Sequence, residues 1–251
     1  MTVMTMTPDI MSEMSDWKAY SPAGTSQEIN FICEVLQLSA NAKILDLYCG
    51  YGRHAIELAK LGYQVTGLDV NQDFLDIARQ KAIEAGVKVD FRHSDMRNMQ
   101  YDQQFDAIIN MFVAFGYFTD TENCDVIKKV ADALKPGGYF LIDLLNREWM
   151  ICNNLNRYWR HPSGEYVLAY KIELQKGMAI MRRELTNQIT GAKTRAEFVL
   201  RAYSMSEMTG ILERNGLSIV HTYGGFDGGE YTKDTPRMII LAKKNRNSVS
   251  D

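Results

Sequence analysis

One stretch, residues 43–70 (KILDLYCGYGRHAIELAKLGYQVTGLDV), constrains the fold more than any other part of the chain. It reads as a buried strand, a glycine-containing turn, an amphipathic helix and a second buried strand, which together form a βαβ unit. Gly50 and Gly52 permit backbone conformations and close approaches that other residues resist, so a ligand can lie against the bare backbone. Asp69 ends the second strand, where a carboxylate can accept hydrogen bonds from a ribose. The stretch therefore predicts an α/β sheet that binds a nucleoside-containing cofactor.

Two kinds of cofactor fit this turn. Residues 50–55 (GYGRHA) also match the loose G-x-G-x-x-G/A pattern of dinucleotide binding. Asp46 lies four residues before Gly50, where a carboxylate suits a cofactor that brings an ammonium group and would repel a pyrophosphate. The arrangement D-x-x-C-G-x-G resembles the first motif of class I S-adenosylmethionine (SAM)-dependent methyltransferases. An NAD-dependent oxidoreductase is the alternative enzyme class.

The resemblance covers nearly the whole chain and is closest to bacterial small-molecule methyltransferases with an antiparallel cap, a group that includes sugar amine and glycine N-methyltransferases. It implies an α/β fold with a doubly wound, seven-stranded, mostly parallel sheet and an antiparallel β cap inserted between strands five and six. One departure is Tyr48, which stands where the usual motif has glycine and would crowd or shape the methionine end of the cofactor. The expected parts are a flexible leader (1–15), a SAM-binding core (16–145 and 204–245), a lid and cap (146–203) and a disordered tail (246–251).

Capping residues mark the expected starts of four helices. Residues 25–28 (TSQE), 119–122 (TDTE) and 204–207 (SMSE) are capping boxes, and Asn71 can cap a further helix. Each is followed by apolar residues at helical spacing, so we expect helices to begin at these four places.

The chain changes character at residue 146. Residues 146–160 are aromatic, basic and irregular, which indicates a lid or linker. The following residues alternate between apolar and polar side chains, and the alternation predicts a three-stranded antiparallel meander. Its expected strands are 165–175, 178–188 and 193–203.

The resemblance also implies which residues hold SAM. In this family the loop after strand three holds the adenine, so Asp95 would accept a hydrogen bond from its amino group and Met96 would donate a backbone N–H. By spacing alone, this loop is equally well a solvated turn. The predicted cofactor-binding residues are Tyr20, Asp46, Tyr48, Gly50, Gly52, Asp69, Val70, Phe74, Asp95, Met96, Asn110 and Met111.

The aromatic loop 111–118 (MFVAFGYF) faces the reacting methyl group in the resembling family. Because that methyl is already activated, positioning can supply most of the catalysis, although a base would help an amine or phenol lose its proton. Tyr117 and His54 are the candidate catalytic residues. The alternative for Tyr117 is a residue that only forms a cavity wall, and the alternative for His54 is a capping or packing residue. Arg201 and Tyr203 could bind a carboxylate or phosphate group of the acceptor. The alternative is that they lie on a solvent-exposed face of the strand. The predicted substrate-binding residues are Phe115, Tyr117, Asn146, Arg201 and Tyr203.

Composition limits the partners. The formal net charge of −3 gives no general attraction to nucleic acid or anionic lipid, and no apolar run reaches the roughly 20 residues of a membrane span. The four cysteines show no C-x-x-C spacing, so the sequence predicts no metal site and fits a reducing cytoplasm. We therefore expect a cytoplasmic monomer or homodimer that moves a methyl group to N or O, and less readily C, of a small organic acceptor and releases S-adenosylhomocysteine. A methyltransferase acting on protein or nucleic acid and a catalytically silent SAM-binding subunit are further alternatives.

Overall fold

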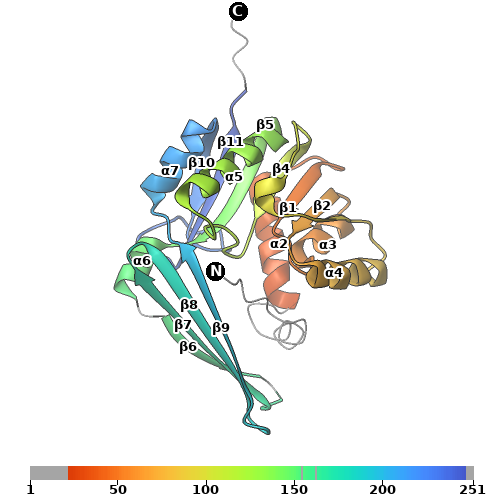
Figure 1. Ribbon diagram of the computed structural model, residues 1–251. Coiled ribbons are helices and arrows are strands. Elements are labelled where there is room, and N and C mark those ends of the chain that lie inside the picture. The colour runs from red at the N-terminus through yellow and green to blue at the C-terminus, as the bar shows by residue number, and fades with distance from the viewer. Residues whose placement is uncertain (1–21, 154, 162, 247–251) are drawn as a thin grey trace, which may run out of the picture.

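The computed structural model describes residues 22–153, 155–161 and 163–246, and it contains two β-sheets (Figure 1). Tyr20, the leader 1–15 and nearly all of the predicted tail lie outside the described residues. The larger sheet has seven strands in the order β10-β11-β5-β4-β1-β2-β3. Its strands are β1 (Lys43–Leu47), β2 (Gln64–Asp69), β3 (Asp90–His93), β4 (Phe105–Asn110), β5 (Leu134–Leu145), β10 (Leu217–Tyr223) and β11 (Arg237–Lys244).

Strands β1 to β5 run parallel, and β11 pairs antiparallel with both β5 and β10. This is the predicted seven-stranded, mostly parallel sheet.

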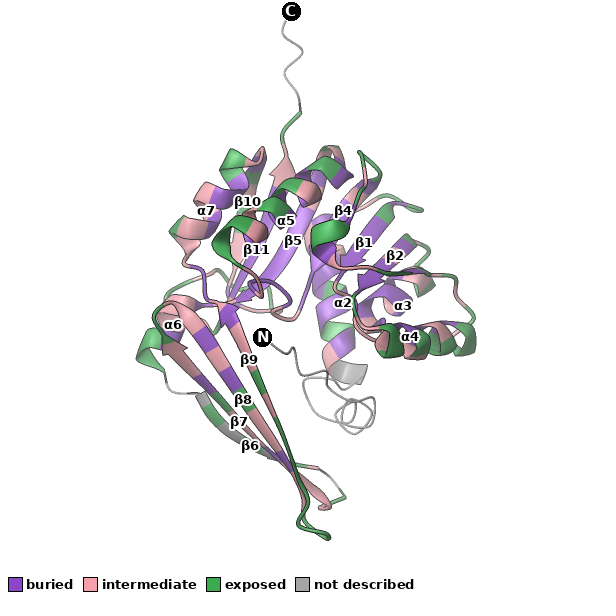
Figure 2. Ribbon diagram, in the orientation of Figure 1, coloured by how far each residue is buried: buried purple, intermediate pink, exposed green. Residues whose placement is uncertain are grey.

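Helices cover both faces of this sheet (Figure 1). One face is covered by α2 (Pro22–Leu36), α3 (Arg53–Lys60) and α4 (Gln72–Glu84), and the other by α5 (Asp120–Ala133) and α7 (Met205–Arg214). The apolar stripes of these helices pack on the Val, Ile and Leu side chains of the strands and form one core layer on each face. Figure 2 shows the result as buried strands beneath helices whose outer surfaces are exposed.

Three of the four predicted helix starts are confirmed. Thr119 and Ser204 form complete capping boxes with Glu122 and Glu207, and the Asn71 side chain accepts a hydrogen bond from the backbone of Phe74. These caps were predictable because they use residues at most three positions apart.

The capping box predicted at residues 25–28 is wrong. Helix α2 begins at Pro22, a residue that suits the first helical turn, so Thr25 lies inside the helix. The carboxylate of Glu28 contacts Arg53 and His54 instead of the backbone at the helix start. A partner from a distant helix therefore decided the role of Glu28.

The smaller sheet is an antiparallel cap with the strand order β6-β7-β8-β9. The three predicted strands are β7 (Tyr166–Gln175), β8 (Met178–Asn187) and β9 (Lys193–Arg201). The prediction of an irregular segment at 146–160 is wrong, because this segment forms α6 (Arg147–Cys152) and β6 (Leu155–Arg160). Alternate residues of β6 do not sort into apolar and polar sets, so only its pairing with β7 makes it a strand.

The cap joins the core where the carboxyl ends of the parallel strands lie. It is inserted between β5 and β10 and extends away from this edge of the sheet (Figure 1). Its inner end is tied to the loop after β4 by a hydrogen bond from Arg201 N to Gly116 O (2.7 Å). The cap and the loops that follow β1, β2 and β4 therefore share one region.

Candidate active site

The turn after β1 contains two glycines, Gly50 and Gly52, in left-handed backbone conformations. Gly50 has a φ of +56°, and a Cβ built there would meet no atom of the described residues within 4 Å, so these residues leave space beside this glycine. Gly52 has a φ of +78°, and its Cβ would come within 2.8 Å of the Phe91 ring. Gly50 thus leaves room for a ligand, while Gly52 allows α3 to pack closely on the sheet.

Asp69 fixes this turn to the end of β2. Its Oδ2 accepts a hydrogen bond from Gly50 N (2.7 Å), and its Oδ1 accepts one from Asn71 N (2.8 Å). Burial raises the pKa of Asp69, although the backbone N–H groups of Asn71 and Gly50 oppose that shift. Each carboxylate oxygen has a further lone pair, so the ribose contact remains a prediction beside this structural role. Val70, directly after β2, is exposed, and Phe74, in the first turn of α4, is half-buried.

Tyr48, at the position where the usual motif has glycine, has a left-handed backbone conformation. Its φ is +70°, a left-handed value that costs a residue with a side chain about 1 to 2 kcal/mol. The ring stacks on that of Tyr117 with centroids 5.7 Å apart and 21° between the planes. Burial and the neighbouring Tyr117, Asp69 and Asp95 hold the pKa of the Tyr48 phenol far above its usual range, so the phenol is neutral. Tyr48 therefore connects the glycine turn to the aromatic loop.

Two buried side chains beside this turn have unsatisfied oxygen atoms. Asp46 is 1% exposed, and its Oδ2 has no hydrogen-bond partner among the residues the structure describes. Burial, with a further contribution from Asp69, raises the pKa of Asp46 to about 7 against the opposing charge of Arg53. Asn110 donates from Nδ2 to Leu47 O (2.9 Å), while its Oδ1 likewise has no partner in that part of the chain. Buried acceptors without a partner are rare in folded proteins, so these two oxygens are candidate contacts for a ligand that carries hydrogen-bond donors.

In the loop after β3, the Asp95 side chain has protein partners that the prediction did not include. Asp95 caps the short 3-10 helix Met96–Asn98 and pairs with Arg97, whose guanidinium lowers the pKa of Asp95. An adenine amino group at Asp95 would share this carboxylate with Arg97. The side chain of Met96 is buried in the core, as is that of Met111 after β4.

His54 is buried and not presented to a ligand. Its Nε2 lies 2.6 Å from Glu28 Oε2, and Glu28 also pairs with Arg53. Burial and the charge of Arg53 lower the pKa of His54 despite Glu28, so the imidazole is neutral. These contacts join α2 to α3, and they support the packing alternative over the catalytic one. Glu28 was missed in the sequence because its position suggested a helix cap.

The aromatic loop after β4 is divided between core and site. Phe115 is buried and packs on Tyr203 with ring centroids 5.8 Å apart, so it lies in the core and not on a pocket wall. Phe112 N donates to Asp143 Oδ2 (2.8 Å), which fixes the loop to β5. Tyr117 is half-buried and lies toward the cap.

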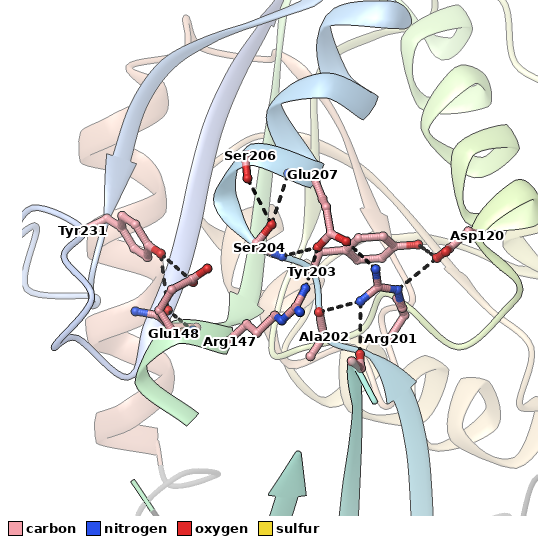
Figure 3. Close-up of polar contacts among 12 residues, drawn as sticks. Asp120, Arg147, Glu148, Arg201, Ala202, Tyr203, Ser204, Ser206, Glu207 and Tyr231 are labelled. Carbon is pink, nitrogen blue, oxygen red and sulfur yellow. Dashed lines mark hydrogen bonds and ion pairs between the residues drawn. The ribbon is translucent and has the colours of Figure 1, made fainter. Parts of the chain in front are cut away.

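Arg201 and Tyr203 are engaged by protein groups (Figure 3). Arg201 Nη1 donates to the carbonyls of Gly177 and Ala202, and its other nitrogens pair with Asp120 and Glu207. The buried Tyr203 hydroxyl donates to Asp120 Oδ1 (2.9 Å) and accepts from Asn123 (3.0 Å). These contacts join the cap to the starts of α5 and α7. Asp120, Asn123 and Glu207 were not among the predicted residues, because their helix-start positions suggested only capping.

Asn146 is also engaged. Its Oδ1 accepts hydrogen bonds from Glu148 N and Trp149 N at the start of α6, and its Nδ2 donates to the carbonyls of Thr232 and Thr235. The side chain therefore joins the cap to the loop before β11, which leaves it no donor for an acceptor molecule.

An open cavity of about 760 Å³ lies between the cap and the starts of α5 and α7. Tyr117 and Arg201 lie on its wall, whereas Phe115, Asn146 and Tyr203 do not. The cavity is lined by Arg97, Tyr117, Phe118, Thr119, Asp120, Glu122, Arg147, Lys176, Gly177, Met178, Val199, Arg201 and Glu207.

Comparison with known proteins identifies the family. A model of the methyltransferase domain matches residues 44–138. YqeM of Bacillus subtilis (strain 168), provisionally named a methyltransferase, is 36% identical in an alignment of 231 residues that covers 85% of this chain and 88% of YqeM. The chain belongs to the class I SAM-dependent methyltransferases.

Solved structures agree with this fold. A SAM-dependent methyltransferase from Clostridium acetobutylicum has a TM-score of 0.80 at 20% identity, and the match covers 94% of this chain and 98% of that one. SAM-bound CalS10, an amino pentose methyltransferase from Micromonospora echinaspora, has a TM-score of 0.72 at 18% identity over 98% and 100% of the two chains. These matches include the cap because they span nearly the whole chain.

The site of this methyltransferase suits SAM, the cofactor of its family. The carboxylate oxygen of Asp46 that has no partner among the described residues would suit the ammonium group of the methionine moiety, and the space beside Gly50 would let a ligand approach the backbone. A dinucleotide would bring its pyrophosphate to the buried Asp46, where the two negative charges repel. The NAD-dependent alternative is therefore set aside.

Proposed function

We propose that this methyltransferase transfers the methyl group of SAM to a nitrogen or oxygen atom of a small organic acceptor. The cavity of about 760 Å³ carries the proposal, since its volume is that of a small-ligand pocket. Tyr117 lies on the cavity wall and stacks on Tyr48 of the glycine turn. An acceptor in the cavity would thus be adjacent to the cofactor site.

SAM supplies an activated methyl group on a sulfonium centre. In this proposal Asp46 neutralises positive charge beside the turn, while the Tyr117 ring, which stacks on Tyr48, orients the acceptor. The Tyr117 hydroxyl could also accept a hydrogen bond from an acceptor N–H or O–H, which makes Tyr117 the candidate catalytic residue. The cap would shield the reaction from water and limit the size of the acceptor. CalS10, which acts on an amino pentose, provides a precedent for a small acceptor in this fold.

The test is a methyl-transfer screen with purified protein. SAM and S-adenosylhomocysteine binding is measured first by calorimetry, and transfer of radiolabelled methyl is then measured to amines, phenols, acids, bulk RNA and a protein extract. We expect micromolar cofactor binding and transfer to at least one small amine or phenol. Transfer confined to RNA or protein would refute the small-acceptor proposal, and cofactor binding without transfer to any class would support a silent subunit.

The other expected partners are also part of the proposal. With a net charge of −3, the protein should show no submicromolar RNA affinity near physiological salt in a filter-binding assay. No helix in the described part of the chain is long and apolar enough to cross a membrane. All four cysteines are free thiols, which supports a reducing cytoplasm, and a monomer or homodimer remains the expected assembly.

A further inference from the structure

The basic side chains on the cavity wall differ in whether an acidic neighbour neutralises them. Three of the four form ion pairs within the protein. Arg97 pairs with Asp95 and Glu122, Arg147 with Glu207, and Arg201 with Asp120 and Glu207. Arg201 is the most constrained of them, since its nitrogens also donate to two backbone carbonyls (Figure 3). It therefore holds the cap in place and is not available to an acceptor.

Lys176 is the fourth basic side chain. It is exposed on the two-residue turn between β7 and β8, and its ammonium group forms no ion pair or hydrogen bond with any residue the structure describes. The three arginines of the wall are paired with carboxylates, so Lys176 is the one basic group of the wall that has no acidic partner in the described part of the chain. The turn itself does not favour lysine. Lys176 has a φ of +50°, a left-handed value that Asn or Gly adopts more readily in such hairpin turns.

Apolar groups line the same cavity. Tyr117 and Phe118 reach it from the aromatic loop, and Met178 and Val199 reach it from the cap strands β8 and β9. The cavity thus combines apolar side chains with one uncompensated cation. A single elongated molecule with an apolar body and an acidic end has the same distribution of polarity.

We propose that the acceptor is anionic, with its carboxylate or phosphate bound by Lys176 and its apolar body held by Tyr117 and Met178. This inference rests on the proposed function, because it names the chemical class of the small acceptor. The wall contacts supply selectivity between charged and neutral acceptors. They do not supply methyl-transfer chemistry, so Lys176 is a specificity-determining residue.

A binding experiment without turnover tests the subsite directly. Benzoate, phenyl phosphate and neutral benzamide are titrated by calorimetry into the full-length protein saturated with S-adenosylhomocysteine. We expect benzoate or phenyl phosphate to bind about five- to twentyfold more tightly than benzamide, and whichever binds more tightly identifies the preferred acid. Lys176→Met should remove this preference.

A matched control is Lys193→Met, which removes a cap lysine that pairs with Glu184 and does not line the cavity. This variant should bind all three probes as the wild type does. Equal binding of anions and benzamide by the wild type, or an anion preference that survives Lys176→Met, would overturn the inference.

Turnover separates the inference from the proposed function. For aromatic amines compared as the carboxylic acid and its amide, Lys176→Met should lower kcat/KM about five- to twentyfold for the acid, mainly through KM, and leave the amide unchanged. If methylated acceptors show no preference for the acid, the small-acceptor function stands and the anionic subsite fails. If anions bind through Lys176 but no small molecule is methylated, the subsite stands and the small-acceptor function fails.

Discussion

Replacement of Asp46 by asparagine should make the protein more stable and its cofactor binding weaker. The pKa of Asp46 rises from 3.8 to about 7 on folding because the carboxyl group is buried, and its Oδ2 has no partner among the described residues. A difference of about three pKa units corresponds to roughly 4 kcal/mol of folding free energy that ionised Asp46 costs, at 1.36 kcal/mol per unit. The asparagine amide is neutral, but an unsatisfied buried amide costs about 1 to 3 kcal/mol. We therefore expect Asp46→Asn to stabilise the protein by about 1 to 3 kcal/mol at pH 8.

The pH dependence identifies the cause. A group whose pKa is raised on folding stabilises the folded state most at low pH, and that contribution is lost as the pH rises through the folded value. The difference between Asp46→Asn and wild type should thus be smallest near pH 4, grow toward pH 7 and then remain constant. Thermal unfolding across pH 4 to 8 measures it, with about 2 to 4 °C expected per kcal/mol.

The matched control is Asp143→Asn. Asp143 is also buried, but it pairs with Arg237 and accepts a hydrogen bond from Phe112 N, so the same substitution there should destabilise the protein. For Asp46→Asn, calorimetry should show SAM affinity reduced about ten- to a hundredfold. A stability difference that does not vary between pH 4 and 8, or a loss of stability at pH 8, would refute the reasoning.

Three other substitutions test the remaining contacts. Tyr48→Gly and Tyr48→Ala both remove the stacked ring, but only glycine relieves the strain of the left-handed backbone. The glycine variant should therefore be about 1 kcal/mol more stable than the alanine variant in urea unfolding. Equal stabilities of the two variants would contradict the strain at this position. Tyr117→Phe should leave acceptor KM unchanged and lower kcat, because it keeps the stacked ring and removes only the hydroxyl. An unchanged kcat would show that Tyr117 only forms part of the cavity wall. Arg201→Met should loosen the cap, seen as faster hydrogen exchange in β8 and β9, while SAM affinity stays within a few-fold; unchanged exchange would show that the other cap contacts suffice.

The sequence predicted those features that depend on neighbouring residues. The glycine turn, the caps at Thr119 and Ser204 and the alternating strands of the cap are confirmed because each pattern is contained in a short segment. The start of α2 and the strand β6 were missed because distant partners decide them. Glu28 contacts Arg53 and His54 across two helices, and β6 exists through its pairing with β7.

The same distinction applies to the site residues. Their place in the fold was predictable for Asp46, Tyr48 and Asp69, which belong to the glycine motif and lie together in the structure. The roles of Arg201 and Tyr203 were not predictable, because alternation in a strand says which way a side chain faces but not what it meets. Asp120 lies about eighty positions away along the chain, at the start of α5, and its carboxylate accepts hydrogen bonds from both side chains.

Backbone strain at the ends of two adjacent strands indicates how the site is maintained. Tyr48 follows β1, and Phe112 and Val113 follow β4; all three have left-handed φ values near +65° although none is glycine. Such conformations persist only where the surrounding structure enforces them, and they are common at functional sites. For Phe112 and Val113 the constraint comes from Asp143, because its Oδ2 accepts from Phe112 N and its carbonyl accepts from Val113 N (3.1 Å). Since Tyr117 belongs to the same loop, Asp143→Asn should lower methyl transfer as well as stability, at temperatures where the variant is still folded.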